Sequence, residues 1–346
     1  METLDIQTLE VSESVGTTPV HWHKSTTSLN SSFYLSVDYA DILRRDGCIP
    51  IFYSLECSGN LIGIALGALT GTWHRWPSRN LKTGFKWNTH PCVKDNDQAT
   101  LDTFVELILH RVNNHRPLEI TLNSEDALIS PSISATHEMI STERLEFRID
   151  LTGGPEQVLS AMQRRKREKL RAELRGSIVT VRETNTKNDL LRLIEFQHSS
   201  RDRRRARGED YSIASESAAQ EIYDNYIGSG HARLFMASDE QGPVSGILLH
   251  TDGKKAYYTM AGCSARGFEV NAQTINVWRA IETLHKDGYT VLNMGGVKAD
   301  AVAPDNVGHG LYRFKKSFGG VETRCTSWHK TTNGIFERIG RAFFGY

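Results

Sequence analysis

Apolar residues recur at helix-like and strand-like spacing throughout the first half of the chain. The clearest pattern lies at 101–112, where Leu101, Phe104 and Ile108 fall on one face of a helix. Similar patterns predict a helix at 37–45 and strands at 49–56, 61–69, 118–122 and 145–151. Gly153-Gly154-Pro155 marks a break and the start of a further helix, which we expect to run to about Leu174.

The second half alternates in the same way. It predicts a strand at 178–182, helices at 190–199 and 216–227, strands at 232–237, 244–250 and 255–260, a helix at 272–286 and a strand at 290–293. This order of helix, antiparallel strands, helix and strand is similar to that of a GNAT acyltransferase, whose sheet splays open to admit the acyl donor. We therefore expect an α/β (α+β) fold of two tandem GNAT-like domains, with mixed, mostly antiparallel sheets flanked by helices, over residues 1–150 and 151–328.

The composition fits two globular domains. The chain has 346 residues, of which 39% are apolar and 24% are charged, enough to bury two moderate cores. The longest apolar stretch, 61–69, contains two glycines and is too short to span a bilayer. The N-terminus is acidic and lacks an apolar secretion core, and the five cysteines include no CxxC pair. We expect a cytoplasmic protein with reduced thiols.

Two stretches of sequence resemble the FemABX family of double-GNAT transferases. The first reads Tyr-Thr-Val-Leu-Asn-Met-Gly-Gly-Val at 289–297 and Gly-Leu-Tyr-Arg-Phe-Lys-Lys-Ser-Phe-Gly-Gly at 310–320. It is similar to the family signature G-x-x-x-x-D-x-G-G followed by G-L-Y-x-F-K-x-x-F-G, except that Asn293 stands where an aspartate is usual. The second is Arg-Ile-Asp-Leu at 148–151, which precedes a basic helix. The resemblance covers roughly residues 30–330.

The resemblance implies aminoacyl-tRNA as the acyl donor, an amine such as that of a peptidoglycan precursor as the acceptor, and neither metal nor CoA as cofactor. It places the family's functional Phe-Lys pair on Phe314 and Lys315. An Arg and a Tyr that contact a nucleotide-linked acceptor would be Arg207 and Tyr211, and a guanidinium suits phosphate or carboxylate because it bonds both oxygens. The C-terminal segment 329–346 would return to complete the first domain.

An aminoacyl ester is already activated, so the enzyme has chiefly to position an amine and to stabilise the oxyanion that forms. Lys315 is our candidate cation for that task. The structural alternative is that Lys315 and Lys316 are surface charges at a helix end. Phe314 is either a core residue or a wall that stacks on an unpaired base of the tRNA end.

Other candidate contacts lie on the strands. Tyr257 and Tyr258 alternate across one strand, so at most one of them reaches the site. We assign Tyr258 to substrate binding, together with Tyr312 and Asn293.

The formal net charge is zero, so affinity for nucleic acid must come from local clusters. Basic runs occur at 164–175 and 201–207. Each is equally explained by a solvated helix face and by contact with tRNA phosphates. The candidate tRNA-binding residues are Arg164, Arg165, Arg167 and Lys316.

The cofactor signals are weak. An acetyl-CoA-dependent GNAT binds pyrophosphate on a Gly-rich turn whose backbone N–H groups open a helix. The corresponding turn, 266–272, lacks the second small residue and carries Glu269, so we expect no CoA there. The thirteen histidines lack metal-ligand spacing, and no serine or cysteine has a nucleophile-elbow sequence. We expect neither a metal site nor a covalent enzyme intermediate.

Three functions remain open at this point. The leading one is an enzyme that uses aminoacyl-tRNA to form a peptide or isopeptide bond on a peptidoglycan precursor or on a peptide-like natural product. The second is an acyl-CoA-dependent GNAT N-acyltransferase that tailors polysaccharides or small molecules. The third is a non-catalytic, GNAT-like RNA-binding module.

Overall fold

The computed structural model describes residues 9–29, 31–71, 84–126, 129–133, 137–205 and 215–331. The chain forms two compact units, one of residues 1–144 with 324–346 and the other of residues 145–323. The chain passes between them within strands β7 (Ile140–Asp150) and β13 (Val321–Thr331). These divisions differ by a few residues from the expected boundaries at 150 and 328, which stay predictions. The expected return of segment 329–346 lies mostly outside the described residues.

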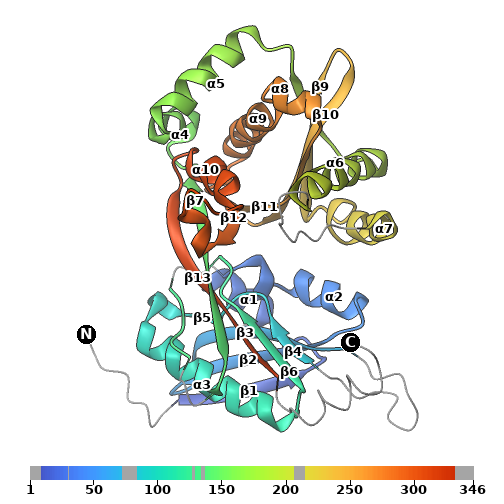
Figure 1. The fold of residues 1–346 in the computed structure, drawn as a ribbon. Coiled ribbons are helices and arrows are strands. Elements are labelled where there is room, and N and C mark those ends of the chain that lie inside the picture. Colours follow the sequence, from blue (N-terminus) through green and yellow to red (C-terminus); the bar gives the residue numbers. More distant parts are fainter. Residues whose placement is uncertain are drawn as a thin grey trace. The chain divides into compact units, whose positions relative to one another are not determined.

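The first unit is a mixed sheet with helices on both faces (Figure 1). Its strand order is β1-β2-β3-β4-β6-β13, and only the β4–β6 pairing is parallel. Its elements are β1 (Leu9–Val15), α1 (Trp22–Ser28), α2 (Val37–Arg45), β2 (Ile49–Cys57), β3 (Asn60–Thr70), β4 (Gly84–Trp87), β5 (Cys92–Val93), α3 (Gln98–Asn114) and β6 (Glu119–Asn123).

Strand β2 is buried on both faces because a helix covers each one. Ile51 and Tyr53 belong to the core that packs under Phe104 of α3. Phe52 points the other way, and its ring meets the edge of Trp22 of α1 at 4.8 Å between centroids. Successive side chains of a strand point to opposite faces of the sheet, so a continuous apolar run gives β2 an apolar surface on each face.

The second unit has the strand order β7-β12-β11-β10-β9-β8. Its antiparallel pairs run from β8 to β11, and β11 pairs with β12 in parallel. Its other elements are α4 (Gly154–Ala161), α5 (Arg164–Gly176), β8 (Thr180–Thr184), α6 (Lys187–Arg205), α7 (Ala219–Ile222), β9 (Ala232–Asp239), β10 (Gly242–Asp252), β11 (Lys255–Cys263), α8 (Ala265–Glu269), α9 (Ala272–Lys286), β12 (Val291–Lys298) and α10 (His309–Lys316).

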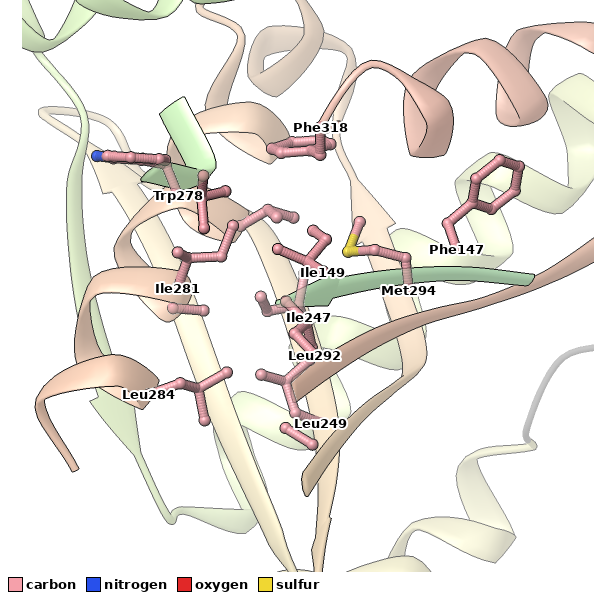
Figure 2. Close-up of a cluster of buried hydrophobic side chains, with 14 of the residues drawn as sticks. Phe147, Ile149, Ile247, Leu249, Trp278, Ile281, Leu284, Leu292, Met294 and Phe318 are labelled. Atoms are coloured by element: carbon pink, nitrogen blue, oxygen red, sulfur yellow. The ribbon is translucent and has the colours of Figure 1, made fainter. Parts of the chain in front are cut away.

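Helices cover both faces of this second sheet as well. Figure 2 shows Ile281 and Leu284 of α9 facing Leu249 and Leu292 of the strands, in the same core as Phe318. Helices α6 and α7 lie on the opposite face (Figure 1), over a separate core of β9 and β10 side chains. The fold class expected from the sequence is therefore confirmed for each unit.

Strands β11 and β12 run together only briefly. Their ladder holds three residue pairs, which end at Tyr257 opposite Asn293. Both strands continue beyond that point, β11 to Cys263 and β12 to Lys298, while β11 still pairs with β10 on its other edge. Beyond this point the parallel ladder no longer pairs the backbone groups of the two strands.

The sequence prediction was wrong in one helix and incomplete elsewhere. The helix expected to run to Leu174 is two helices, because Met162 and Gln163 are extended between α4 and α5. The N–H of Gln163 donates to the carbonyl oxygen of Ser317 at 3.3 Å. This tertiary contact cannot be inferred from the local sequence pattern. Strands β1, β4 and β13 and helices α1 and α8 were not predicted. In the part of the chain that the structure describes, no helix is long and apolar enough to cross a membrane.

Two of the three glycines in the 310–320 signature, Gly310 and Gly319, should respond differently to alanine. Gly319 has a φ of +78°, and a Cβ there would lie 2.4 Å from the carbonyl oxygen of Ala161. Gly310 lies in α10 with nothing within 4 Å of a Cβ. We predict that Gly319→Ala lowers the free energy of unfolding by at least about 1–2 kcal/mol, the cost of a left-handed residue plus the clash. Gly310→Ala should be neutral or stabilising, because alanine favours a helix. Chemical denaturation measures both, and equal effects would contradict the assignment.

Candidate functional site

The candidate site of the second unit is centred on Lys315. This residue lies on the inner face of α10, and its side chain is 6% exposed. Its Nζ donates to the carbonyl oxygen of Gly296 at 3.1 Å and lies 5.9 Å from the ring centroid of Tyr258. Gly296 belongs to β12 and Tyr258 to β11, so the ammonium group lies where these strands diverge. Lys315 is therefore not a surface charge.

The Gly295-Gly296 segment is shaped to accept the ammonium group. Gly295 has a φ of +70°, and a Cβ there would lie 3.0 Å from the carbonyl oxygen of Tyr258 and 3.4 Å from Nζ of Lys315. Its N–H donates to Oδ1 of Asn293 at 2.8 Å. Only glycine combines this conformation with so close an approach, which explains one glycine of the family signature.

Asn293 and Glu146 form a buried pair beside this turn. Asn293 is 2% exposed and Glu146 is 4% exposed. Nδ2 of Asn293 donates to Oε2 of Glu146 at 2.9 Å. The amide group thus connects β12 to β7 while its oxygen holds Gly295.

Tyr258 is oriented by a second chain of hydrogen bonds. Its hydroxyl oxygen accepts from Nε2 of Gln273 at 2.8 Å, and Oε1 of Gln273 accepts from the hydroxyl of Ser245 at 2.6 Å. Tyr258 packs against the same core as α9, whereas Tyr257 is 5% exposed and alternates to the other face. The structure therefore brings Tyr258, and not Tyr257, to Lys315.

Phe314 has an unexpected neighbour on the basic helix. Nζ of Lys166 lies 5.0 Å from the ring centroids of Phe314 and Phe318, and the two rings meet edge to face. The same Nζ donates to the hydroxyl of Thr274, in the first turn of α9, at 2.6 Å. Burial, reinforced by the nearby Lys169, lowers the pKa of Lys166 to about 8 against the opposing charge of Glu173.

Tyr312 and Lys316 pair with each other instead of with Lys315. Nζ of Lys316 donates to the Tyr312 hydroxyl at 2.6 Å and lies 3.5 Å from the carboxylate of Glu322. The hydrogen bond to Tyr312, followed by the charge of Glu322, raises the pKa of Lys316. Lys316 is exposed and Tyr312 is buried.

The basic candidates occupy different environments. Arg164 and Arg165 of α5 are exposed, and Arg164 forms an ion pair with Glu168 at 2.8 Å. Arg167 is partly buried and donates to the carbonyl oxygen of Ser160 at 2.8 Å. Arg207 and Tyr211 lie outside the described residues.

The turn that would hold a CoA pyrophosphate is a closed helical turn. Ser264 caps α8 by accepting from the N–H of Gly267 at 3.0 Å. The N–H groups of Phe268, Val270 and Asn271 also donate to carbonyl oxygens within the turn. Arg266 pairs with Asp239 at 3.0 Å and with Glu269 at 3.1 Å. These donors and this cation are already engaged, so the turn offers little to a phosphate.

Three members of this arrangement escaped the sequence analysis. Lys166 stood in a run read as wholly surface-facing or tRNA-facing, although its i, i+4 spacing to the buried Leu170 places it on the inner side of α5. Gln273 and Glu146 have no sequence signal, because their partners come from other strands. Among the described residues, no group of histidine, cysteine and carboxylate side chains could hold a metal ion.

The comparisons with known proteins agree with this architecture. The sequence model of the acetyltransferase (GNAT) domain family matches residues 160–316. No curated protein sequence matches the chain. The structure is similar to that of FemX, with a TM-score of 0.67 and 12% identity over 94% of this chain and 99% of that chain. It is also similar to a tandem GNAT protein from the clavulanic acid biosynthesis pathway, with a TM-score of 0.52 and 11% identity over 94% of this chain and 99% of that chain.

Identities this low establish the fold alone. The GNAT match falls on the unit that carries Lys315, Tyr258 and Asn293. The chain therefore has a FemABX-like double-GNAT fold, and its second unit contains an acyltransferase domain of the GNAT type.

Proposed function

We propose that this protein is an aminoacyl-tRNA-dependent aminoacyltransferase that acts in the cytoplasm. The acceptor is an amine-bearing peptide or nucleotide-linked molecule, either a peptidoglycan precursor or a peptide-like natural product. The observation that carries this proposal is the buried ammonium group of Lys315 at the divergence of β11 and β12. A fixed cation at that position suits a reaction whose main demand is charge stabilisation.

The reaction follows from this placement. The acceptor nitrogen attacks the ester carbonyl carbon of the donor, a C–N bond forms, and negative charge develops on the carbonyl oxygen. Lys315 stabilises that charge. The C–O bond to the terminal ribose then breaks, and the proton lost by the amine ends on the ribose oxygen. No enzyme nucleophile and no metal is required.

Two further features support a tRNA donor. Phe314 follows Arg313 on α10, with its ring 5.0 Å from Nζ of Lys166, and an aromatic ring can stack on an unpaired base. The adjacent α5 carries the exposed Arg164 and Arg165, and Lys316 extends the positive charge along α10. Arg207 and Tyr211 are proposed as acceptor contacts on the strength of the resemblance alone.

The second candidate is an acyl-CoA-dependent N-acyltransferase. The match of residues 160–316 to an acetyltransferase domain favours it. The engaged N–H groups of the 266–272 turn disfavour it, because a pyrophosphate needs such donors. Incubation with charged tRNA pools and an amine library, followed by mass spectrometry, tests the first candidate. A clear rise in melting temperature with millimolar acetyl-CoA would favour the second, since a ligand at 100 times its Kd stabilises by about 2.7 kcal/mol.

We predict that Lys315→Ala lowers the single-turnover rate of aminoacyl transfer by about 100-fold or more, the cost of one preorganised charge-stabilising group. Arg313→Ala, on the exposed face of the same helix, serves as the control and should retain activity. Circular dichroism must show a native fold for both. An unchanged rate in folded Lys315→Ala would remove this residue from the mechanism.

A second prediction concerns tRNA binding. If the exposed face of α5 meets phosphates, the logarithm of affinity falls linearly with the logarithm of salt concentration, with a slope of about two to four. Arg164→Glu with Arg165→Glu should flatten that slope by about one to two and weaken binding of any tRNA equally, because phosphate contacts carry no sequence information. Arg279→Glu with Lys286→Glu, at two exposed positions of α9, is the charge-matched control. Wild-type affinity and slope in the double variant would show that this face is ordinary solvated surface.

A third prediction uses the pKa of Lys166, which joins α5 to α10. Above pH 8 the folded protein has released this proton, while the unfolded chain, with a pKa near 10.5, still binds it. Stability must therefore rise with pH in this range. We expect the free energy of unfolding of the wild type to increase relative to Lys166→Met between pH 8 and pH 10. Lys286→Met, an exposed lysine of α9, is the control. Parallel curves for wild type and Lys166→Met would contradict the prediction.

A further inference from the structure

We propose that Asn293 and Glu146 are positioning residues that set the location of Lys315 through the Gly295-Gly296 turn. The inference rests on the proposed function for its catalytic consequence, but its structural part can be tested without a substrate.

The first step is that the turn controls the lysine. Nζ of Lys315 donates to the carbonyl oxygen of Gly296 at 3.1 Å, so a rotation of that peptide group moves the ammonium group's acceptor. Gly295 stands directly before it, with a φ of +70° and its Cα facing Nζ. The orientation of this peptide group therefore contributes to the position of the buried cation.

The second step is that Asn293 controls the turn. Its Oδ1 accepts the N–H of Gly295 at 2.8 Å, the i to i+2 bond by which asparagine and aspartate stabilise turns. β12 has already left its parallel ladder with β11 at this point, so that ladder no longer restrains the chain. The side chain of Asn293 therefore restrains Gly295 at a position where β12 no longer pairs with β11.

The third step is that Glu146 fixes the amide of Asn293. Oε2 of Glu146 accepts from Nδ2, so Oδ1 of the same amide is the atom that faces the N–H of Gly295. The two faces leave one orientation of the amide. Both side chains are buried, which strengthens the contact and makes any mismatch costly.

An aspartate at 293 is incompatible with an ionised Glu146 in this position. Two carboxylates would then meet at the 2.9 Å separation now bridged by an N–H, and such a pair cannot both be ionised. One of them would have to take a proton or move away. A carboxylate that moves away disturbs Gly295 and, through Gly296, Lys315, whereas a proton shared by the pair restores a hydrogen bond between them.

The test is a substitution and its compensation. Asn293→Asp should lower the rate of aminoacyl transfer by about tenfold or more relative to wild type at pH 8, and this ratio to the wild-type rate at the same pH should partly recover toward pH 5 as the carboxyl pair takes up a proton. Asn293→Asp with Glu146→Gln restores a donor opposite an acceptor, and it should regain most of the lost rate and melting temperature. Asn306→Asp is the matched control, because Oδ1 of Asn306 accepts from Gly308 at 2.8 Å in the same i to i+2 manner.

A second readout follows Lys315 itself. Pulse labelling with acetic anhydride and mass spectrometry should find Lys315 protected in the wild type, modified in Asn293→Asp and protected again in the double variant. A loss of stability without a change in Lys315 labelling or in the pH dependence of transfer would reduce Asn293 to a packing residue and overturn the proposal. A double variant no better than Asn293→Asp would also overturn it. If the wild type transfers no aminoacyl group, the proposed function fails, while labelling and stability still decide this inference.

Discussion

The separation of β11 from β12 is the constraint on which the second unit depends. Three ladder pairs hold the strands together, and the ladder ends at Tyr257 and Asn293. Buried backbone groups must still find partners, so the space fills with groups that can supply them. Lys315 donates to Gly296 and Asn293 accepts from Gly295. The opening thereby gains a fixed positive charge. The ammonium group of Lys315 provides a hydrogen bond that the buried backbone needs, and it also provides the charge that the proposed reaction needs.

Much of this fold was predictable because local patterns and tertiary packing agree. The helix at 272–286 and the strands that became β9, β10 and β11 follow from periodicity, and their buried faces are the apolar ones. The break between α4 and α5 was not predictable, since it depends on Gln163 reaching the carbonyl oxygen of Ser317 on another element. Strand β13 was also difficult to predict. Its buried and exposed residues do not alternate regularly, so its sequence lacks the period of two that indicates a strand.

The candidate site was predictable only where a residue carries a family signal or a strand alternation. Lys315, Phe314 and Tyr258 were identified on those grounds, and Lys315 and Tyr258 lie together. Glu146 and Gln273 were missed because a hydrogen-bond partner on a distant strand leaves no trace in the local sequence. Lys166 was missed for a different reason. It stands in a run of basic residues, and its spacing of four positions from the buried Leu170 is the sequence feature that places it on the inner side of α5.

Lys166 also connects the two helices of the proposed donor site, α5 and α10. A lysine held against two phenylalanine rings loses hydration, and the resulting fall in its pKa measures the cost of that placement. The hydrogen bond to Thr274 and the attraction to the rings of Phe314 and Phe318 offset part of that cost. Methionine would fill the same space without desolvating a charge. The lysine therefore makes sense as a polar connection between a basic helix and the helix that carries Lys315, because it adds positive charge beside the ring proposed to receive the tRNA end.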